Sequence, residues 1–267
     1  MKQQSSDQIL KCVNDFLSSL PYERKPASLY EPVQYVLAIG GKRIRPVLAL
    51  LGYNLWREQP EDILMPAIGL ETYHNYTLLH DDLMDNADVR RGHQTVHKKW
   101  NANKAILSGD SMLVLAYQRV AQVPADKLQP VLDLFTTTAL EIGEGQEYDM
   151  TFETRNDVTE DEYIEMIRLK TSVLLACALK MGAILADAPQ ADAERMYRLG
   201  EQIVWLSSCR MTYLMSTVTR KCLVRPLVAT LPRIRRPTCS SMPSTVPMKS
   251  RVPNSHVGSM PRRSIAR

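Results

Sequence analysis

The sequence of 267 residues contains no run of 18 apolar residues, no Gly-x-y repeat and no dense set of cysteines. These absences exclude a membrane-spanning helix, a collagen-like chain and a small disulfide scaffold. The best candidate for a membrane segment, residues 171–186, is short and contains Lys180, so a buried helix explains it better. The first 20 residues are amphipathic and lack the apolar block of a signal peptide. We therefore expect a folded cytoplasmic protein with reduced thiols.

Acidic side chains are missing from one part of the chain. Residues 204–267 contain no Asp or Glu, but 12 Lys or Arg and seven of the 16 prolines. Residues 1–203 carry 21 basic and 29 acidic side chains, a net charge of −8. This switch predicts one domain over residues 1–203, followed by a disordered basic Pro/Ser-rich tail over residues 204–267. A nucleic-acid-binding arm is one interpretation of the tail, although its only aromatic residues are Trp205 and Tyr213.

Residues 1–203 have the pattern of an all-α protein. Apolar residues recur at helical spacing throughout, and no long segment alternates with a period of two. Pro46 and Pro130 fall in the first turns of predicted helices, and Thr159 with Glu162 forms a capping box. The predicted helices span residues 6–20, 28–38, 43–57, 62–86, 95–99, 103–122, 126–152, 159–186 and 190–203.

Three aspartates stand at the end of an otherwise apolar predicted helix. Helical spacing places Asp81 and Asp85 one above the other, with Asp82 on the neighbouring edge. Stacked carboxylates repel each other unless a cation lies between them, and an oxygen-only ligand set suits Mg²⁺. The alternative is a solvated acidic turn at a helix end.

Two arginines follow five residues after this acidic cluster. The adjacent guanidinium groups of Arg90 and Arg91 offer forked donors that match phosphate oxygens. Together with the carboxylates they predict a site for a metal-chelated polyphosphate. An exposed basic loop is the alternative.

A Gly-Gly turn opens another predicted helix. The turn at Gly40 and Gly41 permits close backbone approach, and the helix N-terminus with Lys42 and Arg45 favours an anion. The segment is not a Walker P-loop, because its glycine spacing differs and no Ser or Thr follows the lysine. His74 lies seven residues before the first aspartate, hence on the same helix face, although a lone histidine is often only a structural hydrogen-bonding group.

Polar groups interrupt two strongly apolar predicted helices. Gln146 and Asp149 lie in one, and Lys170 and Thr171 lie in the other. An unpaired polar group inside an apolar helix is costly, so Lys170 is a candidate anion-binding residue. A lysine whose ammonium group reaches the surface is the alternative.

These motifs, in this order and spacing, resemble those of the trans-polyprenyl diphosphate synthases, especially the short-chain farnesyl and geranylgeranyl types. The resemblance runs from about residue 28 to residue 203. It implies an all-α isoprenoid-synthase-type helical bundle, usually a homodimer. It also implies Mg²⁺-dependent condensation of isopentenyl diphosphate with an allylic diphosphate to give short-chain linear isoprenoid diphosphates, with no specific nucleic acid as partner.

The resemblance also implies a role for each matching residue. Isopentenyl diphosphate would be held by Lys42, Arg45, His74 and Arg91. The allylic diphosphate would be held by Arg90, and Mg²⁺ by Asp81 and Asp85 with help from Asp82. Lys170 would contact the leaving diphosphate, with Thr171 and Gln146 beside the allylic chain. Tyr76 would form the floor of the chain-length pocket, so we expect a C15 product first and a C20 product next.

After Ile203 the sequence departs from the family pattern, which has a second aspartate-rich motif at this place. Met211 is encoded by ATG and Thr212 by ACN, so a one-base shift reads GAC, an aspartate, across their codons. Permitted codons for residues 204–215 then give G-L-A-F-Q-L-Q-D-D-L-L-D, which is typical of the family. Our hypothesis is a frameshifted gene, which early stop codons in the shifted frame would contradict.

The frameshift hypothesis has physical consequences. The second Mg²⁺ site and the last helices of the bundle would be missing, leaving apolar faces of residues 126–152 and 159–186 partly uncovered. We therefore expect a poorly folded chain with little or no synthase activity. A catalytically inactive relative and, less favoured, a basic-tailed nucleic-acid-binding protein stay open as alternatives.

Overall fold

A computed structural model describes residues 5–22 and 24–203 of the chain. Over these residues the chain folds into helices joined by short loops, with one two-stranded hairpin, so the prediction of an all-α domain is confirmed. In chain order the elements are α1 (Ser6–Ser19), α2 (Ala27–Ala38), α3 (Ile44–Asn54), η1 (Pro60–Ile63), α4 (Leu64–Met84), β1 (Val89–Arg90), β2 (His93–Gln94), α5 (Val96–Lys99), α6 (Ala102–Val120), α7 (Ala125–Phe152), α8 (Glu160–Ile167), η2 (Arg168–Ser172) and α9 (Val173–Leu185). A further helix covers residues 190–203.

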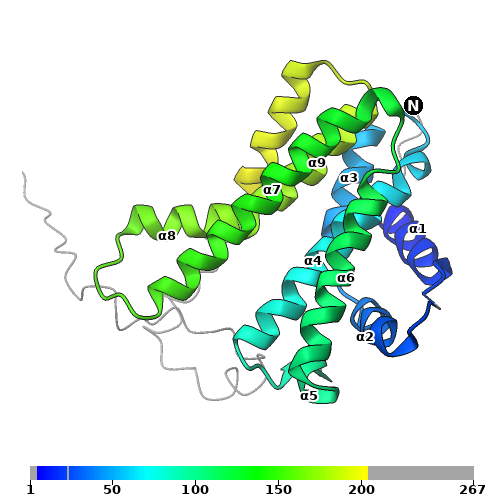
Figure 1. Ribbon diagram of the computed structural model, residues 1–267. Helices are drawn as coiled ribbons and strands as arrows, with labels where there is room; N and C mark the ends of the chain where they lie inside the picture. The colour runs from blue at the N-terminus through cyan, green and yellow to red at the C-terminus, as the bar shows by residue number, and fades with distance from the viewer. Residues whose placement is uncertain (1–4, 23, 204–267) are drawn as a thin grey trace, which may run out of the picture. The chain divides into compact units, whose positions relative to one another are not determined.

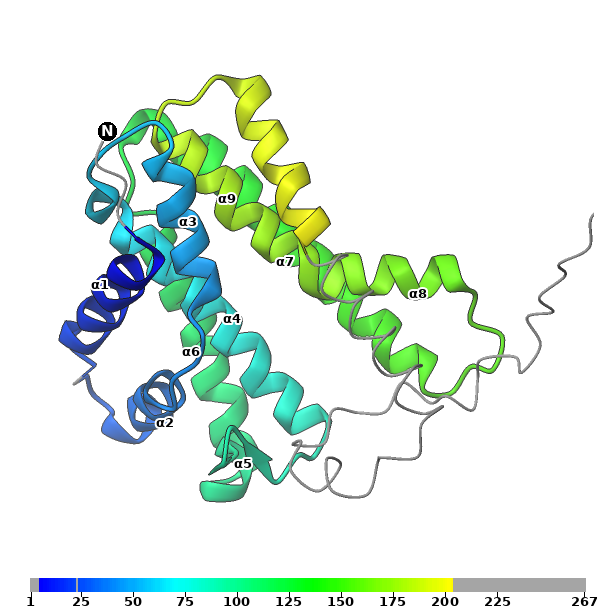
Figure 2. The ribbon, with the colours of Figure 1, turned by 180° about the vertical axis from the view of Figure 1, so that it is seen from behind.

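Helix α4 carries the predicted acidic cluster at its C-terminal end. It packs along α6 and also contacts α1, α2, α3 and α9 (Figures 1 and 2). Its first half is buried on every side, as expected of a helix inside a bundle. The second half leaves this core, so the helix end with Asp81, Asp82 and Asp85 reaches a less crowded part of the molecule.

Helix α9 packs between α3 and α7. Its apolar side chains are buried almost from end to end, since Val173, Cys177 and Met181 are all fully inaccessible. The expectation that residues 159–186 present an uncovered apolar face is therefore wrong for α9. On α7 the same expectation holds, because Leu140 is 71% exposed and both Tyr148 and Met150 are exposed.

Two local features differ from the predicted pattern. The predicted helix over residues 159–186 is interrupted by η2, a π-helical turn that contains Lys170 and Thr171. A hairpin formed by β1 and β2 follows α4, with Arg90 paired to His93 across a two-residue loop. The loop residues Arg91 and Gly92 both have positive φ, of 51° and 82°, which a tight type I′ turn requires.

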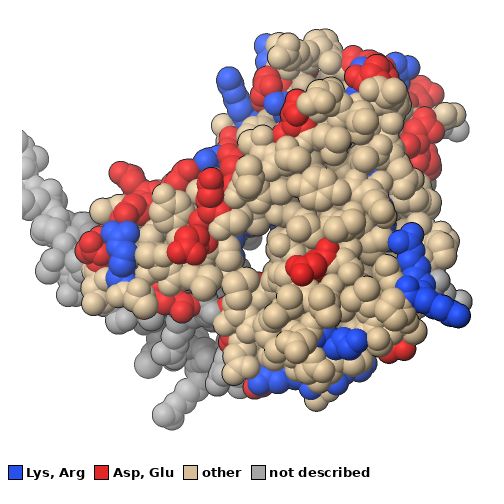
Figure 3. All heavy atoms as spheres, in the orientation of Figure 1, with Lys and Arg blue, Asp and Glu red and all other residues tan. Residues whose placement is uncertain are grey.

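Charged side chains are unevenly distributed over the described surface. Acidic groups gather over α8 and the adjoining end of α7, and basic groups lie near α5 (Figure 3). In the same view an opening lies between the surface of α7 and that of α4. None of the helices in the described ranges has the length and apolar character needed to cross a membrane. The predicted tail, including the region of the proposed frameshift, lies outside the described residues.

Candidate active site

The acidic cluster at the end of α4 faces two basic side chains from distant parts of the chain. Nε and Nη2 of Arg90, which the hairpin turns back toward α4, both lie 2.7 Å from Oδ1 of Asp82. Nη2 of Arg90 also lies 3.4 Å from Oδ2 of Asp81. Nζ of Lys170 lies 3.4 Å from the other carboxylate oxygen of Asp81, Oδ1. The structure therefore brings together residues that lie 89 positions apart, with opposite charges in contact.

Asp82 is the most buried of the three aspartates. Burial raises the pKa of its carboxyl group to about 6, and the guanidinium of Arg90 partly offsets this effect. Its side chain is only 9% exposed, whereas that of Asp81 is 19% exposed. Asp85 follows the last residue of α4 as its C-cap. A buried carboxyl group between two further carboxylates favours the arrival of a cation.

A single lysine connects α4 with α7. Nζ of Lys170 lies 2.6 Å from Oδ2 of Asp149 in α7, which is closer than its contact with Asp81. Its position in a π-helical turn agrees with the frequent occurrence of such turns at functional sites. The neighbouring Thr171 is exposed, and the half-buried Gln146 has a buried Nε2 without a hydrogen-bond partner. Gln146 belongs to α7 and Thr171 to η2, two elements that pack against each other.

The Gly-Gly loop between α2 and α3 is held by arginines from two sides. From the hairpin, Nη1 of Arg91 donates a hydrogen bond to the carbonyl oxygen of Gly40, and its guanidinium lies against Gly41. A Cβ atom at Gly41 would lie only 2.6 Å from that Nη1, and both glycines have positive φ. The loop therefore requires glycine, and Lys42 beside it is exposed to solvent.

Arg43 holds the same loop from inside and is a residue that sequence reasoning did not single out. Its Nη1 donates to Oε1 of Glu71 at 2.8 Å, and its Nη2 donates to the carbonyl oxygen of Leu37 at 2.6 Å. The side chains of Arg43 and Glu71 are only 3% and 2% exposed. The signal that could have revealed the pair was Glu71 itself, an acidic residue within the apolar part of α4.

His74 lies among guanidinium groups. Burial lowers its pKa well below the ordinary value, and the positive charges of Arg45, Arg91, Arg90 and Arg43 add to this effect. Burial also lowers the pKa of Arg45 to about 10, and its Nε has no hydrogen-bond partner. A neutral imidazole surrounded by cationic donors is suited to an anion. The prediction that His74, Arg45 and Arg91 lie together is therefore consistent with this geometry.

Tyr76 belongs to a group of aromatic rings and lies on α4, five residues before Asp81 of the acidic cluster. Its ring centroid lies 5.5 Å from that of Tyr73 and 4.8 Å from that of His80. Tyr73 in turn packs edge-on against Phe135 of α7, which also contacts Tyr117 of α6. Tyr76 was the only ring of this group predicted from the sequence, although the three-residue spacing of Tyr73 and Tyr76 along one helix could have indicated that the two are neighbours.

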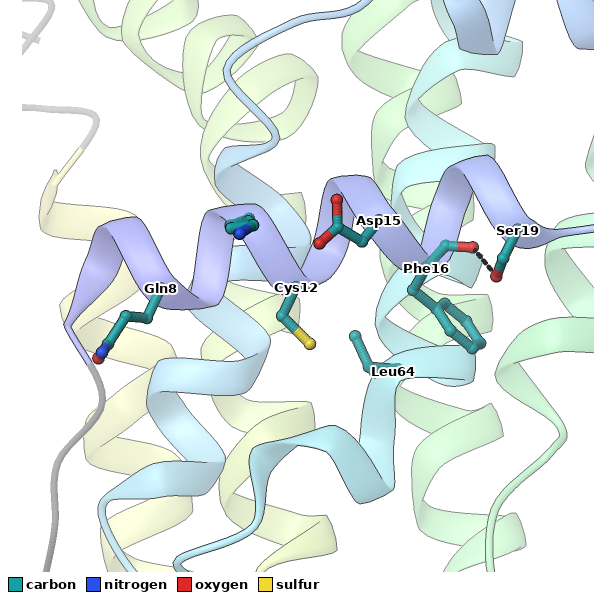
Figure 4. A pocket seen from close by; sticks show the side chains of 7 residues that line it. Gln8, Cys12, Asp15, Phe16, Ser19 and Leu64 are labelled. Carbon is teal, nitrogen blue, oxygen red and sulfur yellow. Dashed lines mark hydrogen bonds between the residues drawn. The ribbon is translucent and has the colours of Figure 1, made fainter.

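A separate surface hollow lies along α1 (Figure 4). The thiol of Cys12 opens into it, and burial raises the pKa of this thiol. The hollow shares no residue with the acidic cluster, so it is not part of the candidate site. Its lining comes from Gln8, Lys11, Cys12, Asp15, Phe16, Ser19 and Leu64.

The described chain is all-α, and carboxylates alternate with cations between α4, α7 and the hairpin. The polyprenyl synthetase family model matches residues 26–205, so the chain belongs to this family. The geranylgeranyl diphosphate synthase of Methanosarcina mazei is 41% identical over 186 residues, which are 69% of this chain and 57% of that protein. A short chain isoprenyl diphosphate synthase of Methanocaldococcus jannaschii is 38% identical over 73% of this chain and 59% of its own length.

Solved structures show the same similarity in three dimensions. A crystal structure of a geranylgeranyl pyrophosphate synthase superimposes with a TM-score of 0.72 at 45% identity, covering 74% of this chain and 61% of that chain. The geranylgeranyl pyrophosphate synthetase of Geoglobus acetivorans gives a TM-score of 0.71 at 35% identity, with 74% and 65% covered. The predicted helical-bundle fold is thereby confirmed. The chain spans about three fifths of the length of these relatives.

Proposed function

We propose that this chain binds isopentenyl diphosphate and an allylic diphosphate, the substrates of prenyl condensation. The observation that carries the proposal is the pair of cations in contact with the acidic cluster. Arg90 contacts Oδ2 of Asp81 and Lys170 contacts Oδ1, 3.4 Å away in each case. A site that alternates carboxylates and cations in this way suits a diphosphate that arrives with a divalent metal.

We further propose Mg²⁺ as the metal. Among the residues that the structure describes, no three His, Cys, Asp or Glu side chains form a ready metal site. Mg²⁺ commonly takes only one or two carboxylates and completes its shell with phosphate oxygens and water. The hard oxygen donors of Asp81 and Asp85, with Asp82 beside them, fit a metal that binds together with the diphosphate. Bound there, Mg²⁺ would supply charge neutralisation for the leaving diphosphate.

The remaining residues have separate roles in the proposal. Arg90 and Lys170 offset the charge that develops on the departing allylic diphosphate, which lowers the barrier to breaking the C–O bond. Isopentenyl diphosphate lies against the second group of donors, namely Lys42, Arg45, His74 and Arg91. Gln146 and Thr171 lie beside the allylic chain, where the helices exclude water from the carbocation.

Tyr76 limits product length in this proposal. Its ring lies below the acidic cluster, against Tyr73. We expect either a C15 or a C20 product. Because some relatives are named geranylgeranyl diphosphate synthase, we favour the C20 product. If the chain turns over, Tyr76→Ala should lengthen the product, as measured by chromatography of the dephosphorylated alcohols. An unchanged product length would remove Tyr76 from this role.

A homodimer is part of the proposal. The exposed side chains of Ile106, Leu107 and Val114 on α6 support it, since they are 44%, 55% and 58% exposed. Two of them lie seven residues apart on one helix face, where a second copy would cover them. Light scattering of Val114→Glu against the wild-type chain tests this assembly.

Isothermal titration with geranyl diphosphate and Mg²⁺ tests the binding function. Arg90→Met should weaken binding by at least about tenfold, because it removes a charged donor from the site. Arg195→Met is the matched control, since this arginine is 76% exposed and pairs with Asp192 on its own helix. Equal affinities for all three chains would refute the proposal.

A turnover assay separates an active enzyme from an inactive relative. We expect little or no condensation of isopentenyl diphosphate with geranyl diphosphate by the purified chain. Turnover at ordinary enzyme rates would contradict the expected loss of activity while supporting the binding function. Binding of nucleic acid that disappears when residues 204–267 are removed would instead favour the basic-tailed alternative.

A further inference from the structure

Lys170 contacts not only the predicted site residue Asp81 but also Asp149, which was not predicted to contact substrate. Its ammonium group lies between two carboxylates, 2.6 Å from Asp149 and 3.4 Å from Asp81. All three side chains are mostly buried, with 28%, 27% and 19% of their surfaces exposed. Asp149 comes from α7 and Asp81 from α4, so Lys170 links two helices that border the site.

The close backbone contact between α7 and η2 fixes the position of the Cα atom of Lys170. A Cβ atom at Gly145 would lie 2.8 Å from the Cα of Lys170, so the two backbones approach as closely as glycine allows. Asp149 lies four residues further along α7, on the same face and about 6 Å along the helix axis. That rise matches the length of an extended lysine side chain, which therefore runs along α7 from Gly145 to Asp149.

The two carboxylates that contact Lys170 differ in what they do when ligands bind. Asp81 also contacts Arg90 and belongs to the cluster predicted to hold Mg²⁺. When Asp81 is engaged by a metal, its attraction for the lysine is reduced. Asp149 lies on the other helix, and its contact with Lys170 persists.

We propose that Asp149 is a positioning residue that keeps the Lys170 ammonium group at the diphosphate site. This inference rests on the proposed function, because it assumes that Lys170 binds diphosphate. Asp149 itself contacts the lysine and not the substrate. The geometry thus gives a role to the last residue of the segment Gly145–Asp149, to which the sequence analysis assigned none.

Two other roles for Asp149 make different predictions. If its charge acted only at long range, removing it would strengthen the binding of an anion, because one repelling carboxylate would be gone. If it were a metal ligand, removing it would weaken binding whether or not Lys170 were present. A positioning residue weakens binding when removed, and only while Lys170 is present.

A double-mutant cycle on the full chain separates these roles. Isothermal titration measures the affinity for inorganic pyrophosphate in saturating Mg²⁺ for the wild type, Asp149→Asn, Lys170→Met and the double variant. We expect Asp149→Asn to weaken binding by about three- to tenfold and to have no further effect in the Lys170→Met background. Asp149→Glu should restore part of the affinity. Glu147→Gln, which removes an exposed carboxylate from the same helix, should leave the affinity unchanged.

A second measurement does not depend on ligand binding. Acylation of lysines by an amine-reactive ester, followed by peptide mass spectrometry, reports how firmly each ammonium group is held. Lys180 serves as the internal reference, because it is 20% exposed and pairs with Glu194 at 2.5 Å. Asp149→Asn should increase the labelling of Lys170 relative to Lys180 by about two- to fivefold.

The outcomes distinguish the inference from the proposed function. Tighter pyrophosphate binding by Asp149→Asn, or an equal loss in both backgrounds, would overturn the positioning role. Unchanged labelling of Lys170 would overturn it as well. Failure of the wild type to bind magnesium pyrophosphate, with labelling changed as expected, would overturn the proposed function while the structural hold on Lys170 stands.

Discussion

Two glycines of α7 provide a direct test of how closely this helix approaches the π-turn that carries Lys170. Gly145→Ala places a methyl group 2.8 Å from the Cα of Lys170 and from the carbonyl carbon of Leu169, where ordinary contact begins at 3.4 Å. Gly143 lies on the same helix, and no atom lies within 4 Å of the place that a methyl group would take there. Both substitutions gain the same helix propensity, about 1 kcal/mol relative to glycine.

The propensity gain cancels when the two variants are compared, so their difference measures the steric cost alone. The backbone nitrogen of Lys170 lies closer still to the added methyl group, so the backbone of the π-turn must move by more than about 0.6 Å to restore contact distance. Overpacking of this kind typically costs about 1–3 kcal/mol. We therefore expect Gly143→Ala to raise the free energy of unfolding and Gly145→Ala to lie about 1–3 kcal/mol below it. Urea denaturation followed by circular dichroism measures both values. Equal stabilisation by both alanines would show that α7 and the π-turn do not touch as described.

Two further predictions concern the arginine-rich side of the site. Arg43→Met should destabilise the chain by about 3–5 kcal/mol, because the buried carboxylate of Glu71 loses its ion-pair partner and keeps only the amide of Asn75. Arg195→Met should cost less than about 1 kcal/mol at its exposed pair, so the thermal unfolding of the two variants should differ clearly. The pKa of His74 is lowered by burial, so His74 takes up its proton mainly in the unfolded chain and should lower stability by up to about 1 kcal/mol between pH 7 and pH 5.5. Asp82, whose pKa is raised to about 6, takes up a proton in the folded chain over the same range and partly offsets this loss. His74→Gln should flatten this slope in urea titrations, and an unaltered slope would show that another group titrates.

The helices were predictable because their signals are local and repeated. Apolar periodicity and prolines in first turns identified each helix to within a few residues, and the capping box at Thr159 and Glu162 is present as predicted. The π-turn was not predictable, since a change in backbone hydrogen bonding leaves no mark in apolar spacing. The hairpin after α4 has strands of only two residues, too short for an alternating pattern to develop.

Site residues were predictable as residue types but not as pairs. Lys170 and Asp149 could be singled out because they interrupt apolar helices. No feature of the sequence near either residue indicates that the two side chains form an ion pair. The basic segment from Lys42 to Arg45 reads as one anion-binding run. In the structure it divides into the exposed Lys42 and the buried Arg43, whose backbone has a φ of 47° at the start of α3. Tertiary contact with Glu71 determines which of these basic side chains is buried, so the spacing of the residues does not reveal it.

The contacts of Asp81 lead to a last prediction, that metal and diphosphate bind together far more strongly than separately. Asp81 contacts Arg90 and Lys170, so both carboxylate and cations already have partners. A metal alone would compete with Arg90 and Lys170 for Asp81, so that each cation would keep only its second carboxylate, Asp82 or Asp149. A diphosphate alone would bring further negative charge beside these carboxylates. Both ligands together give every charge a new partner. Pyrophosphate titrated with Mg²⁺ should therefore bind at least about tenfold more tightly than pyrophosphate titrated with EDTA, and Lys170→Met should reduce this ratio. A ratio near one would mean that the cations on the hairpin and η2 do not exchange partners when the diphosphate arrives.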